Sequence, residues 1–182
     1  MLCLVGASGV GKDTILKKLV EKYDYQRLVT YTTRDKREGE VNGIDYHFVS
    51  PKTFHELCAG DFFAETTSYT VASGEVWEYG TATKDIKDDT IVILNPHGLK
   101  ELKKDKSLDI IAVHLFASYG EIWNRLRKRG EHSDEAARRM ETDKKDFEDI
   151  NEYIDFAINT DGRYSIDEMA DLINQVYSMR RK

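Results

Sequence analysis

A glycine-rich segment near the start of the sequence constrains the fold more than any other feature. Residues 6–14 read Gly-Ala-Ser-Gly-Val-Gly-Lys-Asp-Thr and lie between an apolar run at 2–5 and an amphipathic stretch at 12–23. Glycines in such a turn let successive backbone N–H groups converge on phosphate oxygens, the following helix presents its positive end, and a lysine adds a full charge. The segment therefore predicts a phosphate-binding loop between a strand and a helix.

Two other interpretations of this segment are weaker. The strict phosphate-loop pattern places Ser or Thr directly after the lysine, whereas here Asp13 intervenes before Thr14. A glycine turn with only a packing role would not require the lysine. A dinucleotide-binding fingerprint would require a third glycine where Thr14 stands. The three glycines, the lysine and the flanking elements together favour a phosphate loop.

Hydrophobic periodicity predicts strands that alternate with helices along the chain. We expect strands at 2–5, near 28–32, at 45–49, between 61 and 80, and at 90–94, 109–116 and 154–159. We expect helices at 12–23, 52–59, 97–104, 119–129, 134–150 and 166–180. Such alternation is typical of an α/β fold with a mainly parallel central sheet covered by helices. The aromatic stretch at 61–81 lacks intervening helices, so we expect a small antiparallel excursion there.

Several helix starts have a local signal in the sequence. Pro51 and Pro96 stand where helices can begin, since proline is tolerated at the first helical position. Ser118 precedes Glu121 by three residues, and residues 165–168 repeat this Ser-x-x-Glu pattern. Each pair predicts a capping box, in which serine and glutamate satisfy each other's backbone donors.

Composition narrows the range of partners. Among 182 residues, 40% are hydrophobic and 33% are charged, and the net charge of −6 repels nucleic acid and anionic membranes. The longest apolar runs have strand length, far short of the roughly 20 residues that a membrane span needs. Two cysteines do not suggest a disulfide framework. We therefore expect a cytoplasmic protein of small-molecule substrates, with no nucleic-acid or membrane partner and an undetermined oligomeric state.

A cluster of hydroxyl and cationic side chains occupies residues 30–37, which read Thr-Tyr-Thr-Thr-Arg-Asp-Lys-Arg. The guanidinium groups of Arg34 and Arg37 suit bidentate contacts with a second phosphate, to which Tyr46 could donate its hydroxyl. Taken alone, the segment is more typical of a solvated basic loop than of a phosphate site.

Taken in order, these segments resemble the guanylate kinase family. Gly-Ala-Ser-Gly-Val-Gly-Lys at 6–12 is followed by Thr-Thr-Arg at 32–34, a second arginine three places on, and Gly-Glu-Val-Asn-Gly-Ile-Asp-Tyr-His-Phe-Val-Ser at 39–50. The similarity continues through Phe-Phe-Ala-Glu at 62–65, Tyr-Gly-Thr at 79–81, Arg-Leu-Arg-Lys-Arg-Gly at 125–130 and Asp-Phe-Ala-Ile-Asn at 155–159. It covers nearly the whole chain, and the joint order is more specific than any one segment.

The resemblance implies a phosphate-loop kinase that transfers the γ-phosphoryl group of ATP to a nucleoside monophosphate, with GMP or dGMP as acceptor and Mg²⁺ accompanying ATP. It implies a single domain over 1–182. The core would comprise 1–29, 82–117 and 153–182, with a GMP-binding region at about 30–81 and a lid at about 118–152. Without the resemblance, the arginine-rich stretch 125–139 is equally well explained as a solvated helix face with ion pairs.

Residue roles are also implied by the resemblance. Glu65 would accept hydrogen bonds from guanine, and Thr30 and Thr81 would reach the base edge or the acceptor phosphate. The implied catalytic residues are Lys12, Arg34, Arg125 and Arg139, with Arg138 as the alternative to Arg139. The implied ATP-binding residues are Gly6, Ala7, Ser8, Gly9, Val10, Gly11, Lys12, Asp13, Thr14, Arg129 and Asn159. The implied GMP-binding residues are Thr30, Arg34, Arg37, Tyr46, Glu65, Tyr79, Thr81 and Asn95. No metal ligand is assigned.

The sequence departs from the family pattern around the acceptor. An Asp-x-Asp pair is usual where Ile93 and Asn95 stand, Glu78 replaces the first of two tyrosines, and the segment between Glu65 and Tyr79 is longer than usual. An asparagine carries no charge and offers donors as well as an acceptor, so the preference for guanine could be relaxed.

Two alternatives therefore remain open at this stage. The same fold could phosphorylate another nucleotide or ribose 1,5-bisphosphate, or the chain could be a non-catalytic phosphopeptide-binding module.

Overall fold

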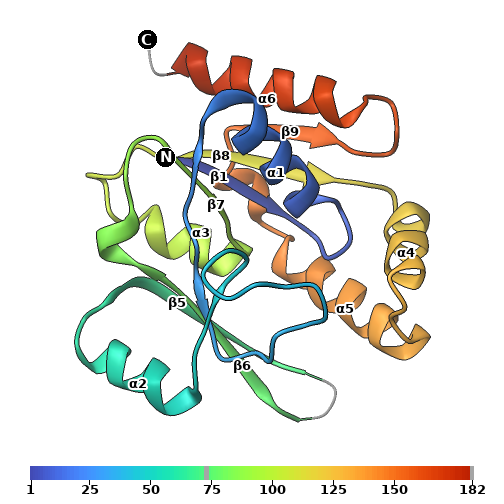
Figure 1. Ribbon diagram of the computed structural model, residues 1–182. Helices are drawn as coiled ribbons and strands as arrows, with labels where there is room; N and C mark the ends of the chain where they lie inside the picture. Colours follow the sequence, from blue (N-terminus) through green and yellow to red (C-terminus); the bar gives the residue numbers. More distant parts are fainter. Residues whose placement is uncertain (72–73, 181–182) are drawn as a thin grey trace.

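The computed structural model of the chain describes residues 1–71 and 74–180. Its larger sheet contains, in spatial order, β2 (Gln26–Arg27), β7 (Thr90–Ile93), β1 (Leu2–Gly6), β8 (Ile111–Phe116) and β9 (Phe156–Asn159), and all neighbours are parallel. The expectation of a mainly parallel central sheet is confirmed. β1 lies in the middle, so the glycine-rich segment leaves the sheet at its centre (Figure 1).

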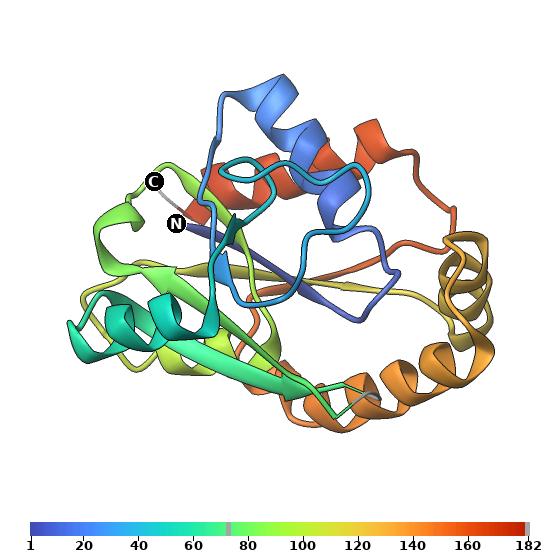
Figure 2. The same ribbon diagram turned by 60° about the horizontal axis from the view of Figure 1, so that its bottom comes forward.

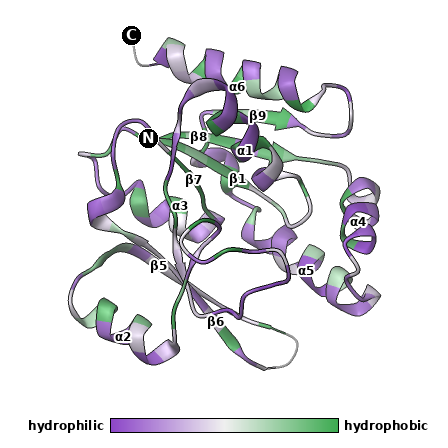
Figure 3. Ribbon diagram, viewed as in Figure 1, coloured by the Kyte–Doolittle hydropathy of each residue, from purple (hydrophilic) through white to green (hydrophobic). Residues whose placement is uncertain are grey.

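Helices cover both faces of this sheet because β1 is apolar on both sides. Leu2 and Leu4 pack in a core with α1 (Lys12–Tyr23) and α6 (Ile166–Arg180). The alternate residues Cys3 and Val5 pack on the opposite face with α3 (Pro96–Leu102). Figure 2 shows α1 and α6 on one side of the sheet and α3 on the other, and Figure 3 shows the hydrophobic strands between them.

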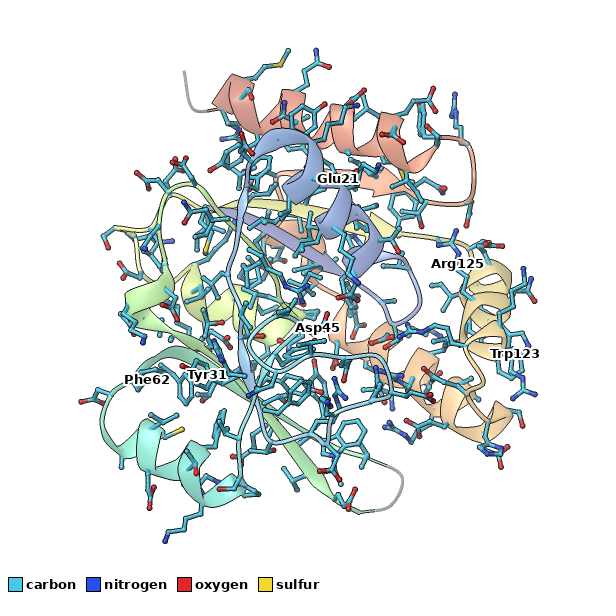
Figure 4. The ribbon with its side chains drawn as sticks, in the orientation of Figure 1. Glu21, Tyr31, Asp45, Phe62, Trp123 and Arg125 are labelled. Atoms are coloured by element: carbon cyan, nitrogen blue, oxygen red, sulfur yellow. The ribbon has the colours of Figure 1, made fainter. Side chains whose placement is uncertain are left out.

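A second, mixed sheet projects from this core. It contains β4 (His47–Phe48), β3 (Tyr31–Thr32), β6 (Val76–Ala82) and β5 (Phe63–Thr70) in that order, and the β5–β6 pair forms a long antiparallel hairpin. Helix α2 (Pro51–Ala59) packs on it by stacking Phe54 on Phe63, with ring centroids 4.7 Å apart. Tyr31 and Phe62 make an edge contact nearby (Figure 4). The expected small β region is confirmed.

The prediction of a single strand near residues 28–32 is wrong. β2 ends at Arg27 on the edge of the parallel sheet, and β3 begins at Tyr31 in the mixed sheet. Leu28 still donates to the Ile91 carbonyl and is buried on the α3 side, whereas Tyr31 pairs with Gly80 of β6. The chain therefore crosses between the two sheets at residues 28–30, which local periodicity does not reveal.

Helices α4 (Tyr119–Lys128) and α5 (Ser133–Asp146) follow β8. The helix expected at 134–150 ends early, because Phe147 stacks on His114 at 5.0 Å and Ile150 is buried on the α3 side. Short 3₁₀ turns lie at Ile150–Glu152 and Thr83–Asp85.

The two expected capping boxes have different outcomes. Ser165 and Glu168 bond reciprocally, so that box is confirmed. Ser118 caps the Glu121 N–H, but the backbone N–H of Ser118 donates to Asp161 and the Glu121 carboxylate turns to Arg125. That box is therefore only half formed.

Among the described residues, none of the helices combines the length and the apolar character that crossing a bilayer requires.

Candidate active site

The glycine-rich loop connects β1 to α1 as the sequence predicts. A side chain at Gly6 would place a Cβ 2.4 Å from the Leu115 carbonyl oxygen, so only glycine fits this approach of β1 to β8. Gly11 has φ +102° and precedes α1, and it brings no side chain to cap the first N–H groups of the helix. The loop thus keeps its backbone donors for an anion.

A carboxylate from α5 accepts a hydrogen bond from the backbone of this loop. The backbone N–H of Ser8 donates to Oδ2 of Asp143 at 2.7 Å, across 135 residues of sequence. The Lys12 ammonium donates to the carbonyls of Gly6 and Ala7 at 2.7 and 3.0 Å. Burial lowers the pKa of Lys12, and the neighbouring carboxylates of Asp143 and Asp13 oppose that effect. The loop therefore binds an anionic group with its backbone, and α5 supplies that group.

A cavity of about 200 Å³ opens beside the loop. It is bounded by the loop, by the β5–β6 hairpin, by the end of β7 and by α5. From the residues expected to bind nucleotides, it is lined by Gly6, Ser8, Lys12, Thr30, Tyr46, Glu65, Tyr79, Asn95 and Arg139. It is also lined by residues that the sequence did not single out, among them Thr67, Tyr69, Trp77, Thr142, Asp143 and Phe147. Arg138, the alternative to Arg139, lines it as well.

Glu65 is a buried carboxylate at one end of this cavity. Its Oε1 accepts a hydrogen bond from the Thr81 hydroxyl at 2.5 Å, and its Oε2 is buried without a partner. Burial raises the pKa of Glu65 to about 7, with a further rise from Glu101 and an opposing effect of Thr81. A buried acceptor without a donor is unfavourable, so this oxygen is arranged for a ligand that donates hydrogen bonds.

Arg34 and Arg37 are not among the described residues that line the cavity, but Arg34 lies over the rings of Tyr46 and Trp77, which do line it. Arg34 is buried, bonds both oxygens of Glu40 at 2.8 and 3.0 Å, and lies 5.3 Å from the Tyr46 ring centroid. Burial and then the positive charges of Arg34, Arg139 and Arg129 lower the pKa of Arg37. Arginines from distant parts of the chain therefore gather around one region, as an anion-binding site requires.

Tyr46 supplies a hydroxyl within this region. Burial, followed by the charge of Asp13, raises the pKa of Tyr46 to about 12, so its hydroxyl remains protonated and able to donate. Its ring is 6.0 Å from that of Tyr79, which also lines the cavity.

The two arginines expected to act from the lid have different surroundings. Arg139 lines the cavity and pairs with Glu131 at 2.7 Å. Arg125, on α4, donates instead to Glu121, to the carbonyl of Val10 in the loop, and to Thr160 (Figure 4). Arg125 thus holds α4 against the back of the loop in this structure.

The residues expected near adenine are exposed or bonded to neighbouring residues. Arg129 is exposed at the end of α4, and Asn159 exchanges hydrogen bonds with Asp161. Asp13 and Thr14 are exposed in the first turn of α1. Glu78 pairs with His55 of α2 at 2.9 Å and is not among the residues that line the cavity. Glu78 therefore does not contribute to the acceptor pocket here.

The comparisons with known proteins agree with this geometry. The family model described as guanylate kinase matches residues 1–176. The guanylate kinase of Syntrophus aciditrophicus is 31% identical over 182 residues, covering 99% of this chain and 86% of that protein. The guanylate kinase of Nostoc sp. is 32% identical over 169 residues, covering 88% and 82%.

A solved structure gives the same result for the fold. The crystal structure of guanylate kinase from Anaplasma phagocytophilum matches with a TM-score of 0.70 and 24% identity, covering 99% of this chain and 85% of that one. Family model, relatives and fold coincide over nearly the whole sequence. The chain belongs to the guanylate kinase family.

Proposed function

We propose that the chain transfers the γ-phosphoryl group of ATP to the phosphate of GMP or dGMP, giving ADP and GDP or dGDP. The observation that carries this proposal is that one cavity is lined both by Ser8 and Lys12 of the phosphate loop and by Glu65 and Tyr79 of the mixed sheet. A donor phosphate on the loop and an acceptor phosphate beside the arginines would thus meet in a single space.

Guanine fits the unpartnered acceptor in this cavity. Its N1–H and exocyclic amine present two adjacent donors, which a carboxylate can accept together. Glu65 already uses Oε1 for Thr81, and the buried Oε2 has no partner. A base that donates hydrogen bonds gives this oxygen a partner. A base that presents acceptors at the same position would leave further buried acceptors without donors.

Positioned cations would carry most of the catalysis. The transferring phosphoryl group passes through a loose transition state with charge on its equatorial oxygens, so no nucleophilic side chain is needed. Lys12 and Arg139 would face that charge, while Arg34 and Arg37 would hold the acceptor phosphate with the hydroxyls of Tyr46 and Tyr79. Arg34 would exchange its bidentate partner Glu40 for the phosphate, or share it.

Helices α4 and α5 would form the lid over both nucleotides. Arg129 and Asn159 would lie near adenine, and Arg125 would position the loop through its contacts with Val10 and Thr160. A closed lid excludes water, which would otherwise compete with the acceptor.

Magnesium is expected to accompany ATP. The exposed oxygen donors of Asp13 and Thr14 at the start of α1 fit a hard cation and would hold it directly or through water. When bound, this ion neutralises phosphate charge during transfer.

Replacement of Lys12 by alanine tests the activity. We expect wild-type protein to form ADP with Mg-ATP plus GMP or dGMP, and little with AMP, CMP, UMP, dTMP or ribose 1,5-bisphosphate. Lys12→Ala should lower kcat by about a hundredfold or more, because an interaction made with the transition-state charge is lost. Lys17→Ala removes an exposed lysine from the same helix and is the matched control. Near-normal turnover in Lys12→Ala, or turnover on another acceptor, would contradict the proposal.

The ionisation of Glu65 should control the pH dependence of GMP binding. Burial raises the pKa of the Glu65 carboxyl to about 7, and the ionised form is needed to accept both guanine donors. Below that pH the proton must first be lost, so the Kd for GMP should be about tenfold weaker at pH 6 than at pH 8. Calorimetry on Glu65→Gln isolates the effect, since that variant retains only the titration of the GMP phosphate. Equal pH dependence in both proteins would refute this role of Glu65.

Asp143 should compete with ATP for the loop. Its carboxylate bonds the Ser8 N–H at 2.7 Å, so a nucleotide phosphate must displace an anion from that donor. Asp143→Asn keeps the shape but removes the charge, and we expect ATP to bind about fivefold more tightly. Asp146→Asn, three residues along the same helix, is the control for lost charge on α5. Weaker ATP binding by Asp143→Asn would mean that the carboxylate assists the nucleotide instead.

A further inference from the structure

The segment that follows β9 reaches the phosphate loop from a distant part of the chain. Gly6 of β1 pairs with Leu115 of β8, and the strands are parallel. The next residue of β8, Phe116, pairs with Asn159 at the end of β9. The loop after β1 and the chain after β9 therefore leave the sheet at the same edge. Thr160 continues the pairing, since its backbone N–H donates to the Phe116 carbonyl at 2.8 Å, and the sheet thus holds it beside the loop.

The Thr160 hydroxyl is buried and bonded to the phosphate loop. Thr160 is 3% exposed, and its hydroxyl donates to the Val10 carbonyl at 3.1 Å, across 150 residues of sequence. The Arg125 guanidinium donates to the same carbonyl at 3.1 Å. It also donates to the Thr160 hydroxyl at 3.1 Å and to the Thr160 carbonyl at 2.6 Å. Two donors from outside the loop therefore meet at one carbonyl oxygen of the loop.

The loop needs an anchor at Val10 because the neighbouring residues do not fix its backbone. Gly9 and Gly11 have φ of +80° and +102°, in the left-handed region that glycine enters freely. Between two such permissive residues, local propensity does not set the direction of the Val10 carbonyl. The bond from the Val10 N–H to the Ala7 carbonyl is 3.3 Å, longer than most backbone hydrogen bonds. The two donors at the Val10 carbonyl therefore set the orientation of this peptide unit.

The Val10 carbonyl shares its peptide plane with the N–H of Gly11. In a trans peptide these two groups point in opposite directions, so the anchored carbonyl turns the N–H away from Arg125 and Thr160. The backbone at Gly11 is open to a ligand, since a Cβ placed there would meet no atom within 4 Å. This N–H comes directly before α1, where backbone N–H groups have no helical partner and can bind a phosphate. The Thr160 hydroxyl thus acts on a peptide unit whose other end can bind an anion.

We propose that Thr160 is a positioning residue for the phosphates of ATP. Its hydroxyl, together with the Arg125 guanidinium, fixes the Val10 carbonyl and thereby directs the Gly11 N–H at the phosphate chain. The inference rests on the proposed function, because it takes ATP as the ligand of the loop. Thr160 acts through the loop backbone and contacts no reacting atom. A threonine with only a packing role would stabilise the fold without changing the affinity of the loop for phosphate.

Calorimetry with Mg-ATP, with magnesium tripolyphosphate and with GMP, each added alone, tests this inference. Thr160→Val keeps the shape and removes the hydroxyl, so ATP and tripolyphosphate should each bind about fivefold to tenfold more weakly, with the Kd for GMP unchanged. Thr160→Ser retains the hydroxyl and should restore both affinities. Thr90→Val is the matched control, because Thr90 is also buried and bonds the Lys87 carbonyl at the start of β7. The ratio of ATP to GMP affinity does not depend on the fraction of folded protein, so a less stable variant can still be measured.

Three results would overturn the inference and leave the proposed function intact. Unchanged affinities for ATP and tripolyphosphate in Thr160→Val would reject a role of the hydroxyl at the loop. An equal loss of GMP affinity, or a loss in Thr160→Ser as large as in Thr160→Val, would indicate a packing role. A loss for ATP without one for tripolyphosphate would mean that the substitution acts on adenine through the neighbouring Asn159. Wild-type protein that binds neither Mg-ATP nor tripolyphosphate would reject the proposed function and this inference with it.

Discussion

The backbone N–H groups of the glycine-rich loop need an anion, and the rest of the site is arranged around that need. The Asp143 carboxylate accepts a hydrogen bond from the Ser8 N–H. The loop can present its donors because β1 lies in the middle of a parallel sheet and Gly6 lets it pass against the Leu115 carbonyl. The position follows a general rule, since ligands of open α/β sheets bind outside the carboxyl ends of the central strands.

The acceptor side of the cavity needs charges of both signs. It must hold a phosphate with cations and also offer negative charge to a base that donates hydrogen bonds. Arg34, buried on Glu40 and the Tyr46 ring, serves the first need, and Glu65, buried with one free oxygen, fits the second. Burial makes both interactions stronger than they would be in water, and also makes an unpartnered Glu65 costly. The acceptor pocket therefore favours a ligand that donates a hydrogen bond to the buried Oε2 of Glu65.

Sequence reasoning predicted those parts of the site that depend on local pattern. The loop is encoded by consecutive glycines and a lysine, and the buried strands by continuous apolar runs such as residues 91–94. Tyr69 and Asp143 carry no such signal, because they reach the cavity only through the tilt of a long hairpin and the placement of α5 over the loop. The split of residues 28–32 between two sheets was missed for the same reason, since tertiary pairing decided it.

A bisubstrate ligand tests most directly whether both nucleotides share one cavity. Adenosine and guanosine joined through five phosphates would span the loop and the acceptor pocket together. If the two sites face each other under α5, this compound should bind at least about a hundredfold more tightly than ATP or GMP alone, because the second half binds within an already formed complex. An affinity no better than that of either nucleotide alone would show that the sites cannot be filled together, and would contradict direct phosphoryl transfer between them.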